Sequence, residues 1–216
     1  MTRQETMSLF NAFPIYGITA EKDSQGRSNY EVVTAMLKAG MKFIQYREKT
    51  KSGLARYEEC VQLRELTAEY GAAFIIDDFV DLALAVKADG VHIGQDDLPP
   101  EVVRELVGED MVIGLSTHSP QQLQAANQKQ NIIDYIGVGP VFATKTKATA
   151  QPVGFSYVEY AAGNSAVPFV AIGGIKDENI FQVWEHGARN FAVVTDITQA
   201  DDIEHKIQNL INSLKR

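Results

Sequence analysis

Eight short apolar segments alternate with segments of helical character along this chain, and no linker interrupts the alternation. The apolar segments, which we expect to be strands, cover residues 14–19, 41–46, 73–76, 90–93, 111–115, 135–138, 168–172 and 190–194. They lack the clear apolar–polar alternation of a half-exposed strand, so both of their faces should be buried. Strands buried on both faces are typical of a parallel sheet covered by helices.

Helix signals fill the intervals between these strands. We expect helices over residues 30–39, 54–70, 80–86, from 99–100 onward, from 119–120 onward, 156–162, 177–186 and 203–214. Ser119 and Pro120 are a suitable cap and first residue for a helix, and Gly71 suits a helix end. Eight such units predict a single-domain (β/α)₈ TIM barrel over residues 1–216, with residues 1–12 as an N-terminal extension. An open doubly wound sheet is the alternative, although no G-x-G-x-x-G motif opens a helix.

Composition narrows the class of protein and of partner. The 216 residues, 45% hydrophobic and 22% charged, fit one soluble globular domain. A formal charge of -8 argues against nucleic acid or an anionic membrane as the main partner. One cysteine, Cys60, excludes an internal disulfide, and residues 1–11 show no signal peptide. We therefore expect a cytoplasmic protein that acts on small molecules, and both a monomer and a homo-oligomer stay open.

A loop with two hydroxyl and two ammonium groups follows the sixth expected strand. Residues 135–138 lead through Gly139-Pro140 to Thr144, Lys145, Thr146 and Lys147. Threonine hydroxyls and lysine ammonium groups are suited to binding a phosphate or diphosphate. The alternative is a solvated basic turn. Active sites of (β/α)₈ barrels lie at the C-terminal ends of the strands. The residues at the other strand ends therefore help to decide between a phosphate-binding loop and a solvated turn.

The other strand ends carry the same kinds of groups. They supply Gln45, Arg47, Glu48 and Lys49; Asp77 and Asp78; Gln95, Asp96 and Asp97; Ser116, Thr117 and His118; Gly173 and Gly174; Thr195 and Asp196. Arg47, Lys49 and Lys147, with Ser116, could surround anionic oxygens. Carboxylates from neighbouring strands could hold Mg²⁺, which is bound by one or two carboxylates together with substrate phosphates. The expected magnesium ligands are Asp78 and Asp97.

Gly173-Gly174 and the segment that follows the eighth strand predict a second anion site. Loops after strands seven and eight of a barrel often bind phosphate through backbone N–H groups, and glycine permits the close approach. A plain tight turn is the alternative. If both anion sites exist, the protein handles two phosphorylated substrates.

Each charged position also has a structural interpretation. Arg47 and Glu48 could form a surface ion pair. At least one of Asp77 and Asp78 is expected to cap the next helix, and Asp97 could cap the one after it.

Three further side chains have ordinary interpretations. His92, between Val91 and Ile93, is expected in the core. Ser116 could be a buried hydroxyl that bonds to backbone, and Cys60 is expected to be an inert helix residue.

Taken together, these motifs resemble thiamine phosphate synthases over residues 14–214. The matching stretches are QYREK (45–49), IIDDFVDLALA (75–85), GVHIGQDD (90–97), GLSTHS (114–119), GVGPVFATKTK (137–147) and VAIGGI (170–175). The resemblance implies an enzyme that joins a hydroxymethylpyrimidine diphosphate to a thiazole phosphate. Diphosphate would leave first, by a dissociative mechanism, and the thiazole nitrogen would attack the pyrimidine-stabilised cation.

The resemblance also implies residue roles. The pyrimidine diphosphate would contact Gln45, Arg47, Lys49, Ser116, Thr144, Thr146 and Lys147, of which Arg47, Lys49, Ser116 and Lys147 carry the catalysis. Asp78 and Asp97 would bind Mg²⁺, and Gly174 with the backbone at Val194-Thr195 would hold the thiazole phosphate. The chain departs from the family pattern at Asp77, a substrate-binding position where Asn is usual, and at Phe79, where Arg is frequent. It also has Thr195 in place of the more usual Ser.

Two rival functions share the barrel. The related thiazole tautomerases have His where this chain has Pro140, and they lack much of the diphosphate-binding set. Arg47, Lys49 and Lys147 together favour the synthase. A non-catalytic binder of thiamine precursors is the second rival, for which the departures at Asp77 and Phe79 leave room.

Overall fold

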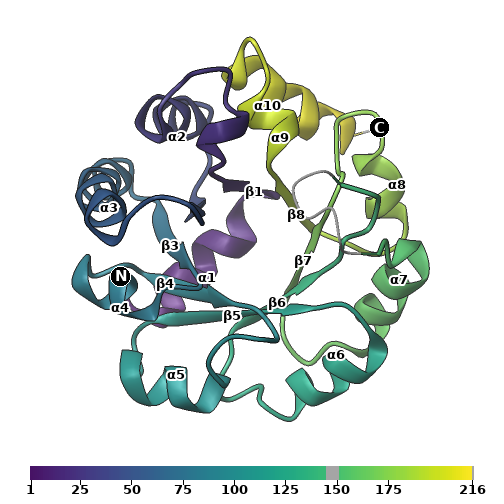
Figure 1. Ribbon diagram of the computed structural model, residues 1–216. Helices are drawn as coiled ribbons and strands as arrows, with labels where there is room; N and C mark the ends of the chain where they lie inside the picture. Colours follow the sequence, from purple (N-terminus) through teal and green to yellow (C-terminus); the bar gives the residue numbers. More distant parts are fainter. Residues whose placement is uncertain (145–150, 216) are drawn as a thin grey trace.

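Eight parallel strands close into a barrel in their sequence order (Figure 1). The structure is a computed structural model that describes residues 1–144 and 151–215. The strands are β1 Ile15–Ile18, β2 Phe43–Tyr46, β3 Ala73–Asp77, β4 Gly90–Ile93, β5 Val112–Thr117, β6 Tyr135–Val138, β7 Phe169–Ile172 and β8 Asn190–Val193. Because β8 pairs with β1, the sheet has no edge, and the open doubly wound alternative is wrong. The predicted (β/α)₈ barrel is confirmed.

Helices surround the barrel (Figure 1). They are α2 Asn29–Lys38, α3 Gly53–Glu69, α4 Val80–Ala85, α5 Pro100–Val107, α6 Pro120–Asn127, α7 Gly154–Asn164, α8 Ile180–Glu185, α9 Thr195–Thr198 and α10 Ile203–Ser213, with a 3₁₀ turn η1 at Glu21–Asp23. The Ser119 hydroxyl accepts from Gln122 N at 3.3 Å and caps α6, as expected. Sequence did not predict the four-residue α9. It also placed the start of α8 too early, because a turn in which Asn179 Oδ1 accepts from Lys176 N precedes that helix.

Two apolar clusters lie on the two sides of the strands. Alternate strand residues point into the barrel, among them Tyr16, Phe43, Ile75, Tyr135 and Val170. The other strand residues pack against the helices in a larger cluster. Every residue of β1, β2, β3, β4, β6 and β8 is buried, which explains why the sequence shows apolar runs instead of period-two alternation.

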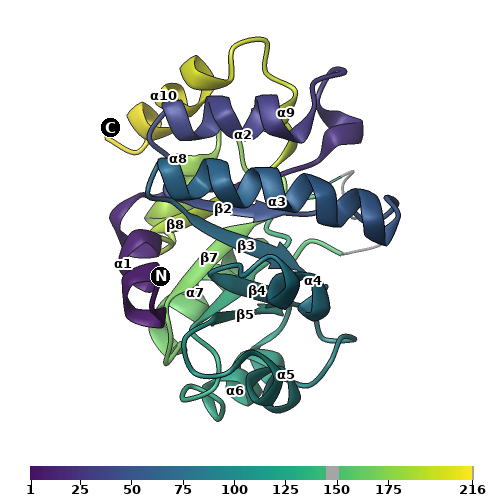
Figure 2. The same ribbon diagram turned by 90° about the vertical axis from the view of Figure 1, so that its left-hand side faces the viewer.

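Helix α1, Arg3–Ala12, covers the N-terminal end of the barrel (Figure 2). Its Phe10 is 2% exposed, and the ring centroid lies 4.9 Å from that of Tyr135 and 5.2 Å from that of Phe43. The Met1 ammonium group lies 3.0 Å from Asp89 Oδ1, and Arg3 pairs with Asp134. The expected N-terminal extension is therefore an ordered helix that closes the barrel opposite the C-terminal ends of the strands. Among the helices of the described residues, none is both long and apolar enough to cross a membrane.

Candidate active site

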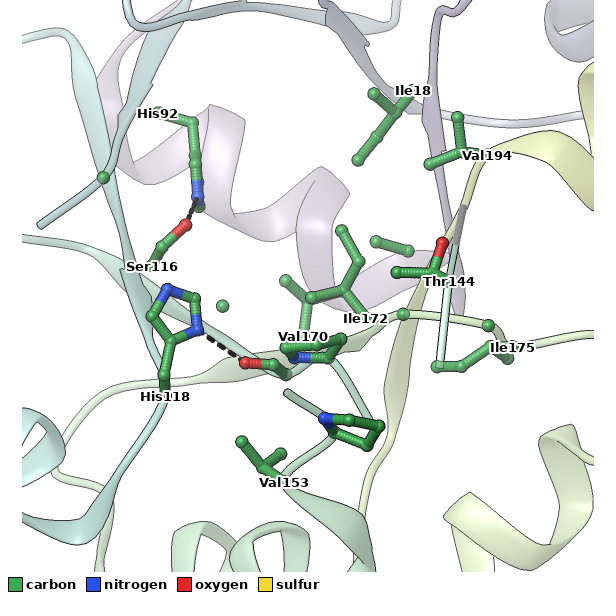
Figure 3. A pocket seen from close by; sticks show the side chains of 18 of the residues that line it. Ile18, His92, Ser116, His118, Thr144, Val153, Val170, Ile172, Ile175 and Val194 are labelled. Carbon is green, nitrogen blue, oxygen red and sulfur yellow. Dashed lines mark hydrogen bonds between the residues drawn. The ribbon is translucent and has the colours of Figure 1, made fainter. Parts of the chain in front are cut away.

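A cavity of about 1200 Å³ lies at the C-terminal ends of the strands. Figure 3 shows Ser116 and His118 on one side of it and Ile18 and Val194 on the other. The predicted site residues that line the cavity are Gln45, Arg47, Lys49, Asp77, Asp78, Asp97, Ser116, Thr144, Gly174, Val194 and Thr195. Thr146 and Lys147 lie outside the described residues. The barrel thus gathers in one cavity all the predicted site residues that the structure describes.

Asp77 holds two cationic side chains together. Its Oδ2 atom lies 3.1 Å from Lys49 Nζ and 3.4 Å from Arg47 Nε, and the Asp77 side chain is 10% exposed. Lys49 also pairs with Asp78. The alternative of a surface ion pair between Arg47 and Glu48 is wrong, because Glu48 is buried on the helix side, where it accepts hydrogen bonds from Glu21 N and Asn29 Nδ2.

Neither of the two aspartates at the end of β3, Asp77 and Asp78, caps the next helix. The N-cap of α4 is Phe79, and no side-chain bond caps that helix. Asp78 has φ +63°, a left-handed conformation that Asp tolerates better than most residues, and its N–H donates to the carbonyl of His92 at 2.8 Å. Phe79 lies under the guanidinium group of Arg56, at 3.6 Å from the ring centroid. The expected cap role is therefore wrong, and both carboxylates belong to the cavity.

Asp97 also differs from a helix cap. Helix α5 follows Pro99 and has no side-chain cap, whereas Asp97 Oδ2 accepts from Gly94 N at 2.6 Å within the loop after β4. In the described part of the chain, the protein contacts of Asp78 and Asp97 both use Oδ2. Among residues 1–144 and 151–215, the second oxygen of each carboxylate has no protein partner.

The donor set fits a magnesium ion held jointly with a substrate. Within residues 1–144 and 151–215, no group of three or more His, Cys, Asp or Glu side chains could hold a metal alone. Two carboxylates, Asp78 and Asp97, line the same cavity as the cationic cluster. Mg²⁺ is commonly bound by one or two carboxylates plus substrate phosphates and water, so these two residues could supply the protein ligands of such an ion.

The loops after β6 and β7 pack against each other. Val141 N donates to Ile172 O at 2.8 Å, and Phe142 N donates to Gly173 O at 3.0 Å. Gly174 has φ +65°, and a Cβ atom there would lie 2.8 Å from Phe142 Cβ. Only glycine fits this contact without strain. The glycines thus form a tight turn and also line the cavity, next to Thr195 at the start of α9.

Two histidines of the cavity wall have assigned partners (Figure 3). His92, 9% exposed, lies with Nε2 2.9 Å from Ser116 Oγ, and burial lowers its pKa to about 4. His118 Nδ1 lies 2.6 Å from the carbonyl of Gly139. The expected burial of His92 is confirmed, and its ring also lines the cavity. The expected bond from Ser116 Oγ to backbone is not found among the described residues, where His92 is its partner.

Sequence reasoning missed several side chains of the cavity. They are Tyr16, Tyr157, Tyr160 and Lys176. Tyr16 and Ile18 both point into the barrel from β1, and counting alternate residues back from the end of that strand would have found them. Asp196 was placed at a strand end but given no role; burial raises the pKa of its carboxyl group, and Lys206 Nζ lies 3.6 Å away.

Fold and cavity together define a class of protein. The chain is a (β/α)₈ barrel whose strand ends present arginine, lysine, hydroxyl and carboxylate groups in one cavity. Such a site is suited to phosphorylated small molecules.

Comparison with known proteins identifies the family. A family model described as thiamine monophosphate synthase matches residues 15–197. The thiamine-phosphate synthase of Pelotomaculum thermopropionicum is 55% identical over 97% of this chain and 96% of that protein, and that of Caldicellulosiruptor saccharolyticus is 50% identical over 100% and 97%. A solved thiamine phosphate pyrophosphorylase from Pyrococcus furiosus superposes with a TM-score of 0.86 at 34% identity, covering 96% of this chain and 98% of that one. The chain belongs to the thiamine monophosphate synthase family.

Proposed function

We propose that this protein joins hydroxymethylpyrimidine diphosphate to thiazole phosphate, forming thiamine phosphate and releasing diphosphate. One observation carries the proposal: the Arg47–Lys49–Asp77 cluster and the Gly173-Gly174 turn line the same cavity. At about 1200 Å³ the cavity exceeds the roughly 300–1000 Å³ of a typical single-ligand pocket. It therefore has room and anion-binding groups for two phosphorylated substrates.

The first substrate is assigned to the side of the cavity formed by β2, β3 and β5. Arg47 and Lys49 would bind the diphosphate through charge-assisted hydrogen bonds, and Ser116 would add a hydroxyl. Gln45 lines the same cavity and would contact the pyrimidine. Thr144 would reach the diphosphate from the β6 loop. Thr146 and Lys147, outside the described residues, are assigned to the diphosphate from their place in the sequence.

The second substrate is assigned to the side formed by the ends of β7 and β8. Gly174, Val194 and Thr195 line this part of the cavity. Backbone N–H groups there would bind the thiazole phosphate, and Thr195 in place of Ser changes little because the backbone makes the contact. This arrangement would direct the thiazole ring toward the pyrimidine.

The reaction requires charge stabilisation more than a nucleophile. Once the bond between the pyrimidine methylene carbon and the diphosphate oxygen breaks, the diphosphate carries the electron pair and the pyrimidine carries the positive charge. Arg47, Lys49 and Ser116 would stabilise the departing diphosphate oxygens. Because negative charge develops on these oxygens in the transition state, this stabilisation would lower the activation barrier. The thiazole nitrogen then supplies the electron pair of the new carbon–nitrogen bond.

We assign Asp78 and Asp97 as the residues that hold Mg²⁺. The described lining carries three basic side chains, Arg47, Lys49 and Lys176, and five carboxylates, Asp77, Asp78, Asp96, Asp97 and Asp196. A diphosphate would meet an excess of negative charge in that lining. A bound divalent cation would offset this excess and neutralise diphosphate oxygens. We also propose a cytoplasmic location, which the unpaired thiol of Cys60 supports.

A turnover assay with both phosphorylated precursors tests the proposal. The purified protein is incubated with both precursors and Mg²⁺, then with EDTA in place of Mg²⁺, and thiamine phosphate is measured. Product formed only with metal is the expected result. Binding of both precursors without product would instead indicate a non-catalytic binder, and failure to bind the diphosphate would indicate a tautomerase.

A further inference from the structure

Four hydrogen bonds cross the barrel interior and join two side chains of the cavity. The interior chain, as we call it, consists of Gln45, Tyr16, Tyr135, His92 and Ser116. The distances are 2.8 Å from Gln45 Nε2 to Tyr16 Oη, 2.9 Å between the tyrosine oxygens, 3.0 Å from Tyr135 Oη to His92 Nδ1 and 2.9 Å from His92 Nε2 to Ser116 Oγ. Both ends of the interior chain, Gln45 and Ser116, line the cavity.

Packing holds the interior chain in place. The Phe10 and Phe43 rings contact both tyrosines. A Cβ atom at Gly114 would overlap the rings of Tyr135 and His92, so glycine is what allows these two rings to approach each other. The hydroxyl groups therefore have little freedom to choose other partners.

Every member of the interior chain is neutral near pH 7. Burial raises the pKa of the Tyr16 and Tyr135 hydroxyls and lowers the pKa of His92 to about 4. Each phenol then has one O–H to donate, and the imidazole has one N–H. Because each group has a single proton to donate, two arrangements are possible: every group donates toward Ser116, or every group donates toward Gln45.

The amide of Gln45 selects between these directions. Its Nε2 donates to Tyr16 Oη, so the Tyr16 hydroxyl would use its own proton to donate to Tyr135. Tyr135 would in turn donate to Nδ1 of His92, which would place the ring proton on Nε2. Nε2–H would then donate to Ser116 Oγ, and the Ser116 proton would face the cavity.

We propose that Tyr16, Tyr135 and His92 are positioning residues that make Ser116 a hydrogen-bond donor toward the cavity. With the amide reversed, Ser116 would donate to His92 and present only lone pairs. The catalytic consequence rests on the proposed function. Diphosphate oxygens accept hydrogen bonds and do not donate them, so the leaving group is stabilised only when Ser116 donates toward the cavity.

The protonated nitrogen of His92 provides the direct test. Nitrogen-15 NMR of the histidine-labelled, substrate-free protein should show His92 with a proton on Nε2 and none on Nδ1. His118 is an internal reference, because Nδ1 faces a carbonyl that can only accept, and it should show the opposite tautomer.

Gln45→Glu should reverse the interior chain. Gln45 is 3% exposed, so burial will raise the pKa of the new carboxyl group above its ordinary value of about 4, and the spectra are recorded over a pH series from 7 to 9. Once ionised, the carboxylate only accepts, so Tyr16 must donate to it. His92 should then shift to the Nδ1–H tautomer, while His118 stays unchanged. Gln124→Glu is the matched control, because Gln124 Nε2 also donates to a tyrosine hydroxyl, Tyr160 Oη at 2.8 Å, but on the surface.

Two results would overturn the proposal: an Nδ1–H tautomer of His92 in the unmodified protein, or an Nε2–H tautomer of His92 that persists in Gln45→Glu. If Gln45→Glu does not fold, Tyr135→Phe decides. That variant removes the donor to Nδ1 but keeps the ring, so His92 should populate both tautomers. An unchanged His92 spectrum in Tyr135→Phe would then contradict the proposal.

Kinetics supply a second readout. Tyr135→Phe should lower kcat by about tenfold with little change in KM, since the diphosphate gains the Ser116 contact mainly as it leaves. Tyr46→Phe is the control: its hydroxyl donates to Glu59 at 2.5 Å outside the barrel, and the rate should not change. Equal losses of kcat in Tyr135→Phe and Tyr46→Phe would show that the Tyr135 hydroxyl contributes only to the stability of the fold. Because NMR needs no substrate, failure of the interior chain is distinguishable from an inactive enzyme.

Discussion

The Asp77 carboxylate lies 3.1 Å from the ammonium group of Lys49, and the same oxygen lies 3.4 Å from Nε of Arg47. An acidic side chain thus orders two basic groups that are assigned to the diphosphate. It also cancels part of their charge. These two effects would oppose each other during substrate binding.

Asp77→Asn should strengthen binding of the diphosphate substrate. The amide keeps the shape of the side chain but removes one negative charge beside Arg47 and Lys49. A partly exposed ion pair is worth roughly 1 kcal/mol, so KM for the diphosphate substrate should fall about fivefold. Asp81→Asn is the control, because Asp81 accepts from Leu82 N at the start of α4 and does not line the cavity. A higher KM in Asp77→Asn would show that ordering the two cations matters more than the charge.

Asp97→Asn should weaken the response to Mg²⁺. An asparagine oxygen can still accept from Gly94 N, so the loop after β4 keeps its conformation while a carboxylate ligand is lost. We expect the Mg²⁺ concentration for half-maximal rate to rise about tenfold or more, measured by titrating the metal at saturating substrates. Asp110→Asn, at an exposed position, is the control. An unaltered titration would show that Asp97 does not bind the metal and serves only to accept the hydrogen bond from Gly94 N.

The order of the strands could be predicted from sequence because each strand is a local apolar run. The positions of most site residues followed, since the ends of parallel strands meet at one end of a barrel. Their partners could not be predicted. Asp77 resembles a helix cap in sequence, and only the closed barrel shows that it meets Lys49 from the loop after β2. Tyr16 and Tyr135 are 119 positions apart, and no local pattern indicates that their hydroxyls touch.

Lys147→Ala should reduce turnover strongly and leave the fold intact. Lys147 lies outside the described residues, so this expectation comes from its place in the loop after β6 and from its charge. Loss of one charge-assisted contact to a leaving diphosphate costs about 100-fold or more in kcat. Thermal unfolding should be unchanged. Lys38→Ala, at an exposed position in α2, removes the same charge away from the cavity and should keep full activity. An unchanged rate in Lys147→Ala would remove the loop from the mechanism.

Gly174→Ala should impair the thiazole side of the cavity and destabilise the fold. The residue has φ +65°, and the new Cβ atom would lie 2.8 Å from Phe142 Cβ and 2.9 Å from Ala143 O. Backbone strain and the steric overlap should together lower the free energy of unfolding by about 1–3 kcal/mol, measured by denaturant titration. KM for the thiazole phosphate should rise more than KM for the diphosphate substrate.

Gly163→Ala is the matched control for Gly174→Ala. Gly163 lies in α7, and among the described residues a Cβ atom there would meet no heavy atom within 4 Å. Alanine should therefore stabilise the protein by about 0.5–1 kcal/mol through its higher helix propensity, without any change in KM. Opposite signs of the two stability changes would attribute the loss in Gly174→Ala to the turn between β7 and α8. If Gly174→Ala raised both KM values equally, the turn would have no separate role in binding the second phosphate.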